Sequence, residues 1–397
     1  MLAALRLVVL VLAIGPFVFY LLCLYSIVDY FRSVRKRSPR NHSFAPPASL
    51  LKPVRGVDRD AYENFASFCQ LDYPEYELVF AVADVADPAV AIIEKLQRDF
   101  PNCTIRLVTA QQSFGENRKV NNLAAAARAA RYDLLVMTDS DVRVEPDYLR
   151  EVAAPFADAK VGAVTAFYRC LGGGTFAADL DMIGMAADSV PDALIARELE
   201  GKVQFTFGWT MATTKVRLAE IGGWEAMANH HSDDFELGNR IAKAGHRVEL
   251  MRKPVWMVFP QETTADFLHH EMRWAIGLRN VRPVGYIGML FTHGLPWAVA
   301  AAIAAATADW WAIGALYLLM YVILRLSVAW TAGVWGLGDR GIAGKLWLVP
   351  ARDAISAAVW VAGFFSDKIR WRGLEYRVRK GLLVPVAQKG PEARGTN

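Results

Sequence analysis

The segment LLVMTDSDVRVEPDYL, residues 134–149, joins an apolar run to two closely spaced carboxylates. The run at 133–138 predicts a buried strand, and Asp139 and Asp141 follow it with one serine between them. Two carboxylates at a strand end suit a hard divalent cation, Mg²⁺ or Mn²⁺, and leave coordination positions for phosphate oxygens. The same pattern also arises when the first acid caps a turn and the second is solvated, so other residues must decide between the two interpretations.

Short β-rich runs alternate with helical stretches on both sides of this segment. Strands are predicted at 48–54, 77–83, 103–108, 133–138 and 161–167, and helices at 59–71, 88–100 and 119–130. This alternation predicts βαβ units and a mostly parallel sheet, in which ligands bind beyond the carboxyl ends of the strands. Asp84 follows the second predicted strand and Asp139 the fourth, so we expect both acids at one edge of the sheet.

The N-terminal segment 7–28 is uncharged and long enough to cross a bilayer, which takes about 20 residues. It exceeds the apolar part of a secretory signal and is followed by Arg32, Arg35, Lys36, Arg37 and Arg40, so we interpret it as a retained helix. The positive-inside rule then places the chain after it on the cytoplasmic side, in a multi-pass protein of a bacterial inner membrane.

The region after residue 260 is again typical of a membrane protein. Residues 266–282 suit an interfacial helix, 290–307 and 310–337 suit two crossings, and 346–365 is a weaker third that contains Arg352 and Asp353. Three crossings would put the basic residues 368–380 outside, although their charge favours the inside. The sequence therefore leaves the side of the C-terminus open.

The predicted parts are an anchor at 1–31, a catalytic domain at 44–260, an interfacial helix at 263–282, transmembrane segments at 288–366 and a basic tail at 367–397. The net charge of +4 is explained by basic residues beside membrane segments, and no pattern indicates nucleic-acid binding. The four cysteines lack metal-type spacing and are expected to be reduced.

Six ordered motifs connect these elements to a known family. They are LLKPVRGVD from Leu50, LDYPEYELVFAVADVADPA from Leu71, NRKVNNL from Asn117, TDSDVRV from Thr138, SDDFELG from Ser232 and HEMRW from His270. Over about residues 49–283 the chain resembles family 2-like glycosyltransferases of the GT-A fold. More narrowly, it resembles the membrane-bound ceramide glucosyltransferase group, which includes bacterial enzymes that glycosylate hopanoid lipids. The resemblance implies an α/β GT-A domain, Rossmann-like with a mostly parallel sheet, between α-helical transmembrane segments.

The resemblance also assigns the donor site. Pro53 and Asp84 would hold the base and ribose of the nucleotide, and Lys119, Asn121 and Asn122 would line the donor pocket. Asp139, together with Asp141, would hold the metal and the diphosphate. The structural interpretations are a helix cap at Asp84 and an ordinary polar helix start at Lys119.

For catalysis, the resemblance makes Asp234 the general base, with Asp233 supporting the site; a helix N-cap is the structural interpretation of this pair. One base and a single displacement imply inversion at the anomeric carbon. Arg273 and Trp274 would close the site and stabilise the diphosphate, or else act as interfacial snorkelling residues. His270 stands where Gln or Arg is usual, which leaves its role open. His230 and His231 are expected in a polar loop.

The sequence therefore predicts a membrane glycosyltransferase that uses a UDP-sugar, with UDP-glucose as first choice, and glycosylates a lipid of the bilayer. Ceramide is the first acceptor, and a hopanoid with an N-acetylhexosamine donor is the second. The stretch 176–199 would either shape an acceptor groove on the membrane or pack on the sheet. A polysaccharide synthase, an inactive membrane scaffold and a metal-dependent nucleotidyl transferase are also compatible with parts of the pattern.

Overall fold

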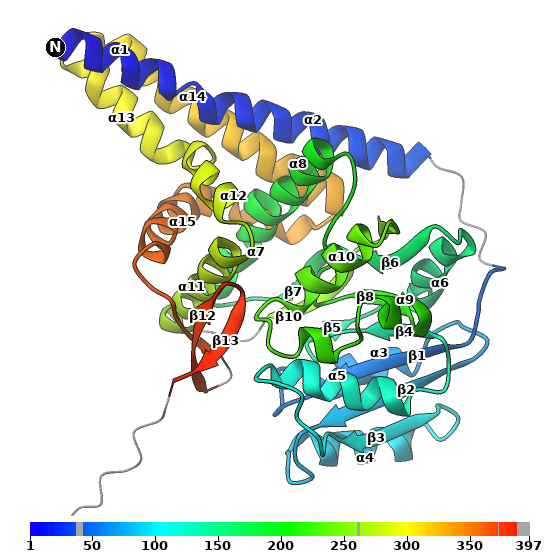
Figure 1. Cartoon of the computed structure of the whole chain (residues 1–397). Coiled ribbons are helices and arrows are strands. Elements are labelled where there is room, and N and C mark those ends of the chain that lie inside the picture. Colours follow the sequence, from blue (N-terminus) through cyan, green and yellow to red (C-terminus); the bar gives the residue numbers. More distant parts are fainter. Residues whose placement is uncertain (37–42, 260–262, 372, 387–397) are drawn as a thin grey trace, which may run out of the picture.

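The computed structural model describes residues 1–36, 43–259, 263–371 and 373–386. An α/β domain lies at one end of the molecule and a set of long helices at the other (Figure 1). The helices of the middle of the chain, α7 and α8, lie between these two parts, so the sheet and the membrane-type helices share one interior.

The main sheet has seven strands and is mostly parallel, which confirms the predicted α/β class. Its order is β3 (Ile105–Thr109), β2 (Tyr76–Val82), β1 (Ala48–Pro53), β4 (Leu134–Met137), β8 (Met211–Thr214), β6 (Val161–Thr165) and β9 (Arg247–Leu250). Only β8 runs antiparallel to its neighbours β4 and β6. The strands predicted from the sequence occur in this sheet, and the loop with Asp139 and Asp141 follows β4. The sheet therefore agrees with the GT-A class that the motifs predicted. The apolar runs of β1, β2 and β4 are buried almost throughout, as expected for a sheet covered on both faces.

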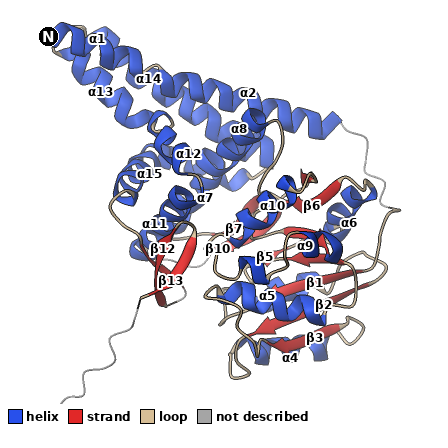
Figure 2. Ribbon diagram, in the orientation of Figure 1, coloured by secondary structure: helices blue, strands red, loops and turns tan. Residues whose placement is uncertain are grey.

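Short helices connect and cover these strands (Figure 2). They are α3 (Ala61–Phe68), α4 (Ala89–Asp99), α5 (Arg118–Ala129), α6 (Tyr148–Ala153), η1 (Ala154–Ala157), α9 (Lys215–Glu220), η3 (Glu225–Met227) and α10 (Asp233–Lys243). A second, three-stranded sheet carries β5 (Val142–Arg143), β10 (Val255–Phe259) and β7 (Tyr168–Gly172). β5 begins directly after Asp141, so the second sheet fixes the far side of the acidic loop.

The segment predicted at 176–199 forms one bent helix. It comprises α7 (Phe176–Gly184), the π-helical turn η2 (Met185–Ser189) and α8 (Val190–Glu200). α8 packs on α2, and η2 packs on α14. This segment is therefore covered by other helices and forms a wall inside the molecule.

Two helical stretches are long and apolar enough to cross a membrane, and a bent pair would make a third. The first is Leu2–Lys36, formed by α1 (Leu2–Leu12) and α2 (Gly15–Lys36); the second is Trp311–Leu337, formed by α14 (Trp311–Ala329) and η5 (Trp330–Leu337). The bent pair joins α12 (Pro283–Gly288) and η4 (Met289–Phe291) to α13 (Gly294–Ala306), with a bend of 40°. Arg37 and Arg40 of the basic flank lie outside the described residues.

The predicted weaker crossing at 346–365 corresponds to α15 (Val349–Gly363), which follows η6 (Arg340–Leu348) and is not among the candidate spans. Arg352 and Asp353 on α15 are buried, 6% and 4% exposed, and point to other helices. Their charges are thus paired inside the protein.

The residues predicted as a basic tail form a small antiparallel sheet up to residue 385. Its strands are β11 (Lys368–Trp371), β12 (Leu374–Arg379) and β13 (Leu382–Pro385). Ile369, Tyr376 and Val378 alternate with charged residues, and together with Leu383 they pack on Ile276 of α11 (Thr264–Val281). The prediction counted the basic residues and overlooked this alternation, which is the pattern of strands with one buried face. The end of the predicted tail, 387–397, lies outside the described residues.

Candidate active site

A cavity of about 1160 Å³ opens beyond the carboxyl ends of β1 and β4 and continues between the helices. It brings together most of the residues predicted for the donor site and for catalysis, which are Pro53, Lys119, Asn122, Asp139, Asp141, Asp233, Asp234, His270, Arg273 and Trp274. They lie at the end of β1, on α5, after β4, on α10 and on α11. Motifs that are far apart in the sequence therefore meet in one cavity.

A buried lysine holds the acidic loop after β4, which carries Asp139 and Asp141. Lys52 of β1 is fully buried, and its Nζ donates a hydrogen bond to the backbone oxygen of Asp139 at 3.0 Å. The ammonium also lies 3.7 Å from the ring centroid of Phe68. Burial lowers the pKa of Lys52 to about 7. The hydroxyl of Ser140, between the two acids, donates a hydrogen bond to the carboxylate of Asp58. This contact and the bond from Lys52 hold the loop in place.

Lys119 lies at the first turn of α5 and faces the acids. Its Nζ is 2.7 Å from Oδ1 of Asp139 and 3.5 Å from Oδ2 of Asp233. Burial works against the charge of this ammonium, yet the carboxylates of Asp139, Asp233 and Asp234 raise its pKa above the usual value. Asn117 caps α5 through Val120 N at 3.2 Å and donates through Nδ2 to the backbone oxygen of His230 at 2.8 Å. The cap thus ties the lysine to the loop that precedes α10.

Asp234 lies in the first turn of α10 with both carboxylate oxygens held. Oδ2 accepts a hydrogen bond from Gly208 N at 3.1 Å, and Oδ1 accepts one from Phe235 N at 2.8 Å. Burial, with the neighbouring charge of Asp233, raises the pKa of Asp234 to about 6. A carboxylate with a raised pKa is a stronger base than an ordinary aspartate, and it faces a cavity.

Gly208 is the point where these groups approach each other most closely. A methyl group at this position would lie 2.9 Å from Nζ of Lys119, 3.1 Å from Oδ2 of Asp139 and 3.6 Å from Oδ2 of Asp234. The close approach explains why the turn between β8 and the preceding loop carries a glycine. Together with Lys52, Gly208 was missed by the sequence analysis, because the turn has no signature of its own.

The HEMRW residues on α11 close the cavity on a different side. The guanidinium carbon of Arg273 is 5.8 Å from the ring centroid of Trp371 in β11. Trp274 is 45% exposed and meets His270 edge-on, with the ring centroids 5.6 Å apart. Nδ1 of His270 lies 3.6 Å from Oδ2 of Asp181 on α7. His270 therefore connects α11 to α7, which is a structural role for the residue that departs from the family pattern.

His230 and His231 lie in a polar loop before α10, as expected, but His231 is not on the surface. His231 is buried and lines the cavity, and its Nδ1 lies 3.1 Å from Oγ of Ser232. Burial, together with the positive charge of Arg273, lowers its pKa to about 3, so the imidazole is neutral at physiological pH. The backbone of this loop is held by the C-terminal sheet, because His231 N donates to the oxygen of Gly381 at 2.9 Å.

Two predicted donor residues do not line the cavity. Asp84 is exposed and accepts a hydrogen bond from Ala86 N at 2.9 Å in the turn before α4, whose N-cap position is occupied by Pro88. Asn121 bonds to Phe114 N at 2.9 Å and to the oxygen of Gly115 at 2.8 Å, and so holds the loop before α5. Asn122, its neighbour, faces the cavity because successive helical residues point in different directions.

Two further cavity residues stand within the motifs and were not singled out. Arg55 stands in LLKPVRGVD and Arg118 in NRKVNNL, and both line the cavity near Tyr376 of β12. These arginines add positive charge where a diphosphate would be bound. The sequence contained a signal for both, because they are basic residues close to Pro53 and Lys119 in the quoted motifs.

The residues of the acidic loop fit a divalent cation that is completed by a substrate. In the described part of the chain, no group of three or more His, Cys, Asp or Glu residues is placed to hold a metal by itself. Mg²⁺ commonly uses one or two protein carboxylates together with substrate phosphates and water. Asp139 and Asp141 line the same cavity and supply such a pair.

Comparison with known proteins places this geometry in a family. The family model described as "Glycosyl transferase family 21" matches residues 8–384. The chain belongs to glycosyl transferase family 21. The match includes the N-terminal helices and the small C-terminal sheet as well as the α/β domain, and it bears out the resemblance to ceramide glucosyltransferases.

Several curated relatives of this family 21 member act on lipids by name. Ceramide glucosyltransferase 1 of Caenorhabditis elegans is 26% identical over 230 residues, which are 58% of this chain and 49% of the relative. Ceramide glucosyltransferase of Komagataella phaffii is 31% identical over 142 residues, 34% of this chain and 28% of the relative. Beta-monoglucosyldiacylglycerol synthase of Synechocystis sp. is 24% identical over 243 residues, 58% and 48% of the two chains. The chain spans at most about half the length of these relatives.

Among solved structures, mannosyltransferase PcManGT from Pyrobaculum calidifontis, in complex with GDP-Man and Mn²⁺, is 16% identical. The similarity covers 88% of this chain and 99% of that one, with a TM-score of 0.49. A likeness of this size carries no argument about the site of the family 21 member, which rests on its own residues.

Proposed function

We propose that this protein is an inverting glycosyltransferase that moves a hexose from a UDP-sugar to the hydroxyl of an uncharged membrane lipid. UDP-glucose is the first donor and ceramide the first acceptor. The observation that carries the proposal is the cavity itself. It joins the acidic loop, the basic carboxylate of Asp234 and the interior between the membrane-type helices in one space.

The reaction follows from the placement of three groups. Asp234 accepts the proton of the acceptor hydroxyl while that oxygen attacks the anomeric carbon and the bond to the diphosphate breaks. Lys119 and Arg273 supply positive charge for the departing nucleoside diphosphate. A single displacement inverts the anomeric carbon, so an α-linked donor gives a β-linked product, by the geometric rule that holds for glycosidases.

A divalent cation would be held by Asp139 and Asp141. Bound with the donor, Mg²⁺ or Mn²⁺ would stabilise the negative charge that develops on the diphosphate. Lys119 forms an ion pair with Asp139 at the same place. Pro53 lies at the end of β1 and lines the cavity, which suits the predicted contact with the nucleotide. Asp84 faces solvent, so we place the ribose contact on the backbone beside Pro53.

The membrane arrangement is part of the proposal. Arg32, Arg35 and Lys36 end the first apolar helix next to the α/β domain, so the positive-inside rule puts that domain in the cytoplasm of a bacterial cell. The acceptor would then enter from the inner membrane along the helices. Diacylglycerol is a second acceptor, since the Synechocystis relative is named for a glucosyldiacylglycerol product.

The test is transfer by the purified full chain in liposomes with Mg²⁺ or Mn²⁺. UDP-glucose and UDP-N-acetylglucosamine are each offered with ceramide, diacylglycerol and a hopanoid, and the products are identified by mass spectrometry. We expect a monohexosyl lipid and loss of transfer by about 10²-fold or more in Asp234→Asn. Products that carry a growing sugar chain would favour a polysaccharide synthase. Absence of sugar transfer from either donor to any of the lipids would overturn the proposal.

A further inference from the structure

The part of the cavity nearest the membrane-type helices is lined by charged residues. They are Asp181, Asp188, Asp192, Glu271, Arg325, Arg352 and Asp353. Ionisable groups beside membrane helices are costly and are usually functional. We call Asp188, Asp192, Arg325, Arg352 and Asp353 the polar niche. Its residues belong to η2, α8, α14 and α15, and none of them is part of the acidic loop or of α10.

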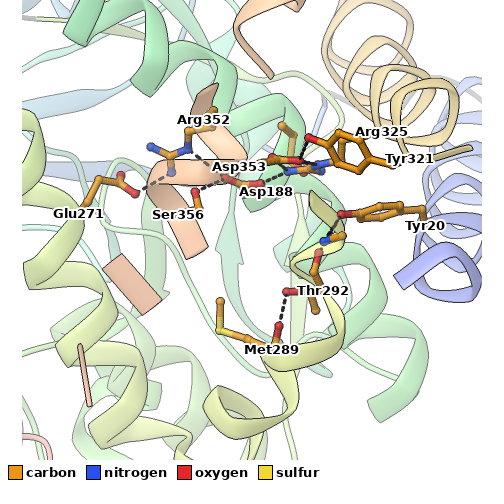
Figure 3. A network of polar contacts seen from close by, with 12 residues as sticks. Tyr20, Asp188, Glu271, Met289, Thr292, Tyr321, Arg325, Arg352, Asp353 and Ser356 are labelled. Atoms are coloured by element: carbon orange, nitrogen blue, oxygen red, sulfur yellow. Dashed lines mark hydrogen bonds and ion pairs between the residues drawn. The ribbon is translucent and has the colours of Figure 1, made fainter. Parts of the chain in front are cut away.

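The two arginines of the niche form ion pairs with neighbouring carboxylates (Figure 3). Nε of Arg325 donates to both carboxylate oxygens of Asp353, at 3.0 and 2.9 Å, and its Nη2 pairs with Asp188. Nε of Arg352 donates to Asp188 at 3.0 Å, and its Nη2 lies 2.7 Å from Glu271. An anion that enters the cavity therefore meets guanidinium groups that are already paired.

The π-helical turn η2 explains how Asp188 reaches both arginines. Such turns insert an extra residue into a helix and are frequent at functional sites. Here Asp188 receives bonds from Arg325 on α14 and from Arg352 on α15, and Ser356 donates to it at 3.5 Å. The carboxylate thus joins three helical segments at the wall of the cavity.

Asp192 is the member of the niche that is open to an occupant. It lies one turn after Asp188 and lines the cavity, and no hydrogen bond or ion pair to it is found among the described residues. Its side chain is exposed, and it faces the cavity. Protein atoms packed around this position and the nearby Asp188 carboxylate raise the pKa of Asp192 to about 7. The carboxyl group accepts hydrogen bonds in either protonation state.

A second polar group points to the same conclusion. Arg352 is only 6% exposed and lines the cavity, and its Nη1 has no hydrogen-bond partner in the described part of the chain. A buried donor without a partner is costly, and an oxygen atom of a bound molecule would satisfy it. The niche thus offers one free acceptor and one free donor, a match for a hydroxyl or an amide.

The charge balance adds selectivity. Around the niche the acids outnumber the arginines, so a phosphate head group would meet net negative charge. Phe19, Met289 and Trp360 line the cavity beside these groups and provide apolar surface for hydrocarbon.

We propose that the polar niche is the subsite that binds the uncharged, hydrogen-bonding head of the acceptor lipid and rejects anionic phospholipids. This inference rests on the proposed function. The lipid's hydroxyl or amide contacts Asp192 while its reacting hydroxyl reaches Asp234 along the same cavity.

The test compares Asp192→Leu and Asp192→Asn with the full wild-type chain in nanodiscs. Asp192→Leu removes the free acceptor, so we expect the KM for short-chain ceramide to rise about tenfold, as for loss of a buried hydrogen bond to a substrate. Hydrolysis of UDP-glucose without lipid, and its KM, should not change. Glu198→Gln is the matched control, because Glu198 is an exposed acid on the same helix that does not line the cavity.

Asp192→Asn keeps the size and the hydrogen bonding and removes only the charge. We expect its KM for ceramide to stay close to that of the wild type, while inhibition by phosphatidylglycerol becomes stronger by about fivefold, an effect of the size that one like-charge contact exerts. Stabilisation against heat by added ceramide gives a readout without turnover, and it should be lost in Asp192→Leu.

Unchanged lipid KM, unchanged inhibition and unchanged stabilisation in both variants would overturn the niche while leaving the proposed function intact. A wild-type protein that glycosylates no lipid, yet is stabilised by ceramide through Asp192, would keep the binding site and remove the proposed function.

Discussion

At the scale of single residues, the site depends on how carboxylates are placed. Asp234 receives two backbone hydrogen bonds and still has a raised pKa, because burial and Asp233 act against its charge. Asp139 instead forms an ion pair with Lys119, whose Nζ lies 2.7 Å from its Oδ1. Two aspartates of one cavity are thereby suited to different tasks, one to accept a proton and the other to hold a cation.

The raised pKa of Asp234 predicts the pH dependence of the rate. The base acts as a carboxylate, and its pKa of about 6 lies above the ordinary value of 3.8, so the active form is lost as the pH falls through about 6. We expect kcat/KM to be level above this pH and to drop about tenfold for each unit below it. Measured transfer that stays constant down to about pH 4.5 would remove Asp234 as a base with a raised pKa.

Gly208→Ala tests the close approach of the acidic and basic groups. The added methyl would contact Lys119 at 2.9 Å and Asp139 at 3.1 Å, and it should push the lysine from the acid. We expect kcat/KM to fall about tenfold or more with little loss of stability, because a displacement of about 1 Å in a site is that costly. Gly344→Ala is the control, since no atom lies within 4 Å of its added methyl. Equal activity in the two variants would contradict the geometry.

At the scale of elements, the small C-terminal sheet forms part of the wall of the cavity. Trp371 and Tyr376 line the cavity, and Leu383 N donates to the oxygen of Asn229 at 2.8 Å. Residues more than a hundred positions after the α/β domain thus hold the loop that leads to Asp234. The match to the family model includes this sheet up to residue 384.

Val378→Asp should separate this sheet from α11. Val378 is 1% exposed in the cluster around Ile276, and an unpaired carboxylate there costs several kcal/mol. We expect faster proteolysis after residue 366 and loss of transfer by about tenfold or more, because the site loses one wall. Val384→Asp places the same charge at a position that is 41% exposed, and it should behave like the wild type. Full activity in Val378→Asp with a detached sheet would show that the sheet is dispensable.

At the scale of the whole molecule, the N-terminal helix is more than an anchor. Tyr30 of α2 donates to the oxygen of Met251 at 3.2 Å and packs edge-on against Phe167, with ring centroids 6.1 Å apart. Nearer the start of α2, the hydroxyl of Tyr20 donates to the oxygen of Thr292 at 2.9 Å and accepts from Gly294 N at 2.9 Å. One helix therefore contacts the α/β domain and the bend before α13, and it joins the catalytic and membrane parts.

Tyr20→Phe measures this coupling. It removes the hydroxyl that accepts from Gly294 N and donates to the oxygen of Thr292 at the bend, at a cost of roughly 0.5–1.5 kcal/mol for each hydrogen bond lost, so the protein should unfold at a lower temperature in detergent. Tyr25→Phe removes a hydroxyl from the same helix at a position that is 62% exposed, and we expect no change. If both variants unfold at the wild-type temperature, α2 serves only to attach the protein to the membrane.

The sequence by itself determined the features that depend on neighbouring residues. The apolar run before Asp139 gave β4, the alternation of strands and helices gave the parallel sheet, and the apolar stretches gave the candidate spans, because strand, helix and membrane patterns repeat within a few residues. The motifs also pointed to Asp234 and Lys119, which lie at element ends where side chains meet in a sheet of this class.

The tertiary structure decided what depends on distant segments and on side-chain direction. Asn121 and Asn122 are adjacent, yet only the latter faces the cavity, since each helical residue is turned by about 100° from the one before it. Lys52 lies beneath Asp139 although 87 positions separate them. The pairing of Asp188 with Arg325 crosses 137 positions, and no local pattern encodes it. Such contacts exist only because the whole chain packs in one way, and they shape the cavity in which we propose that the lipid reacts.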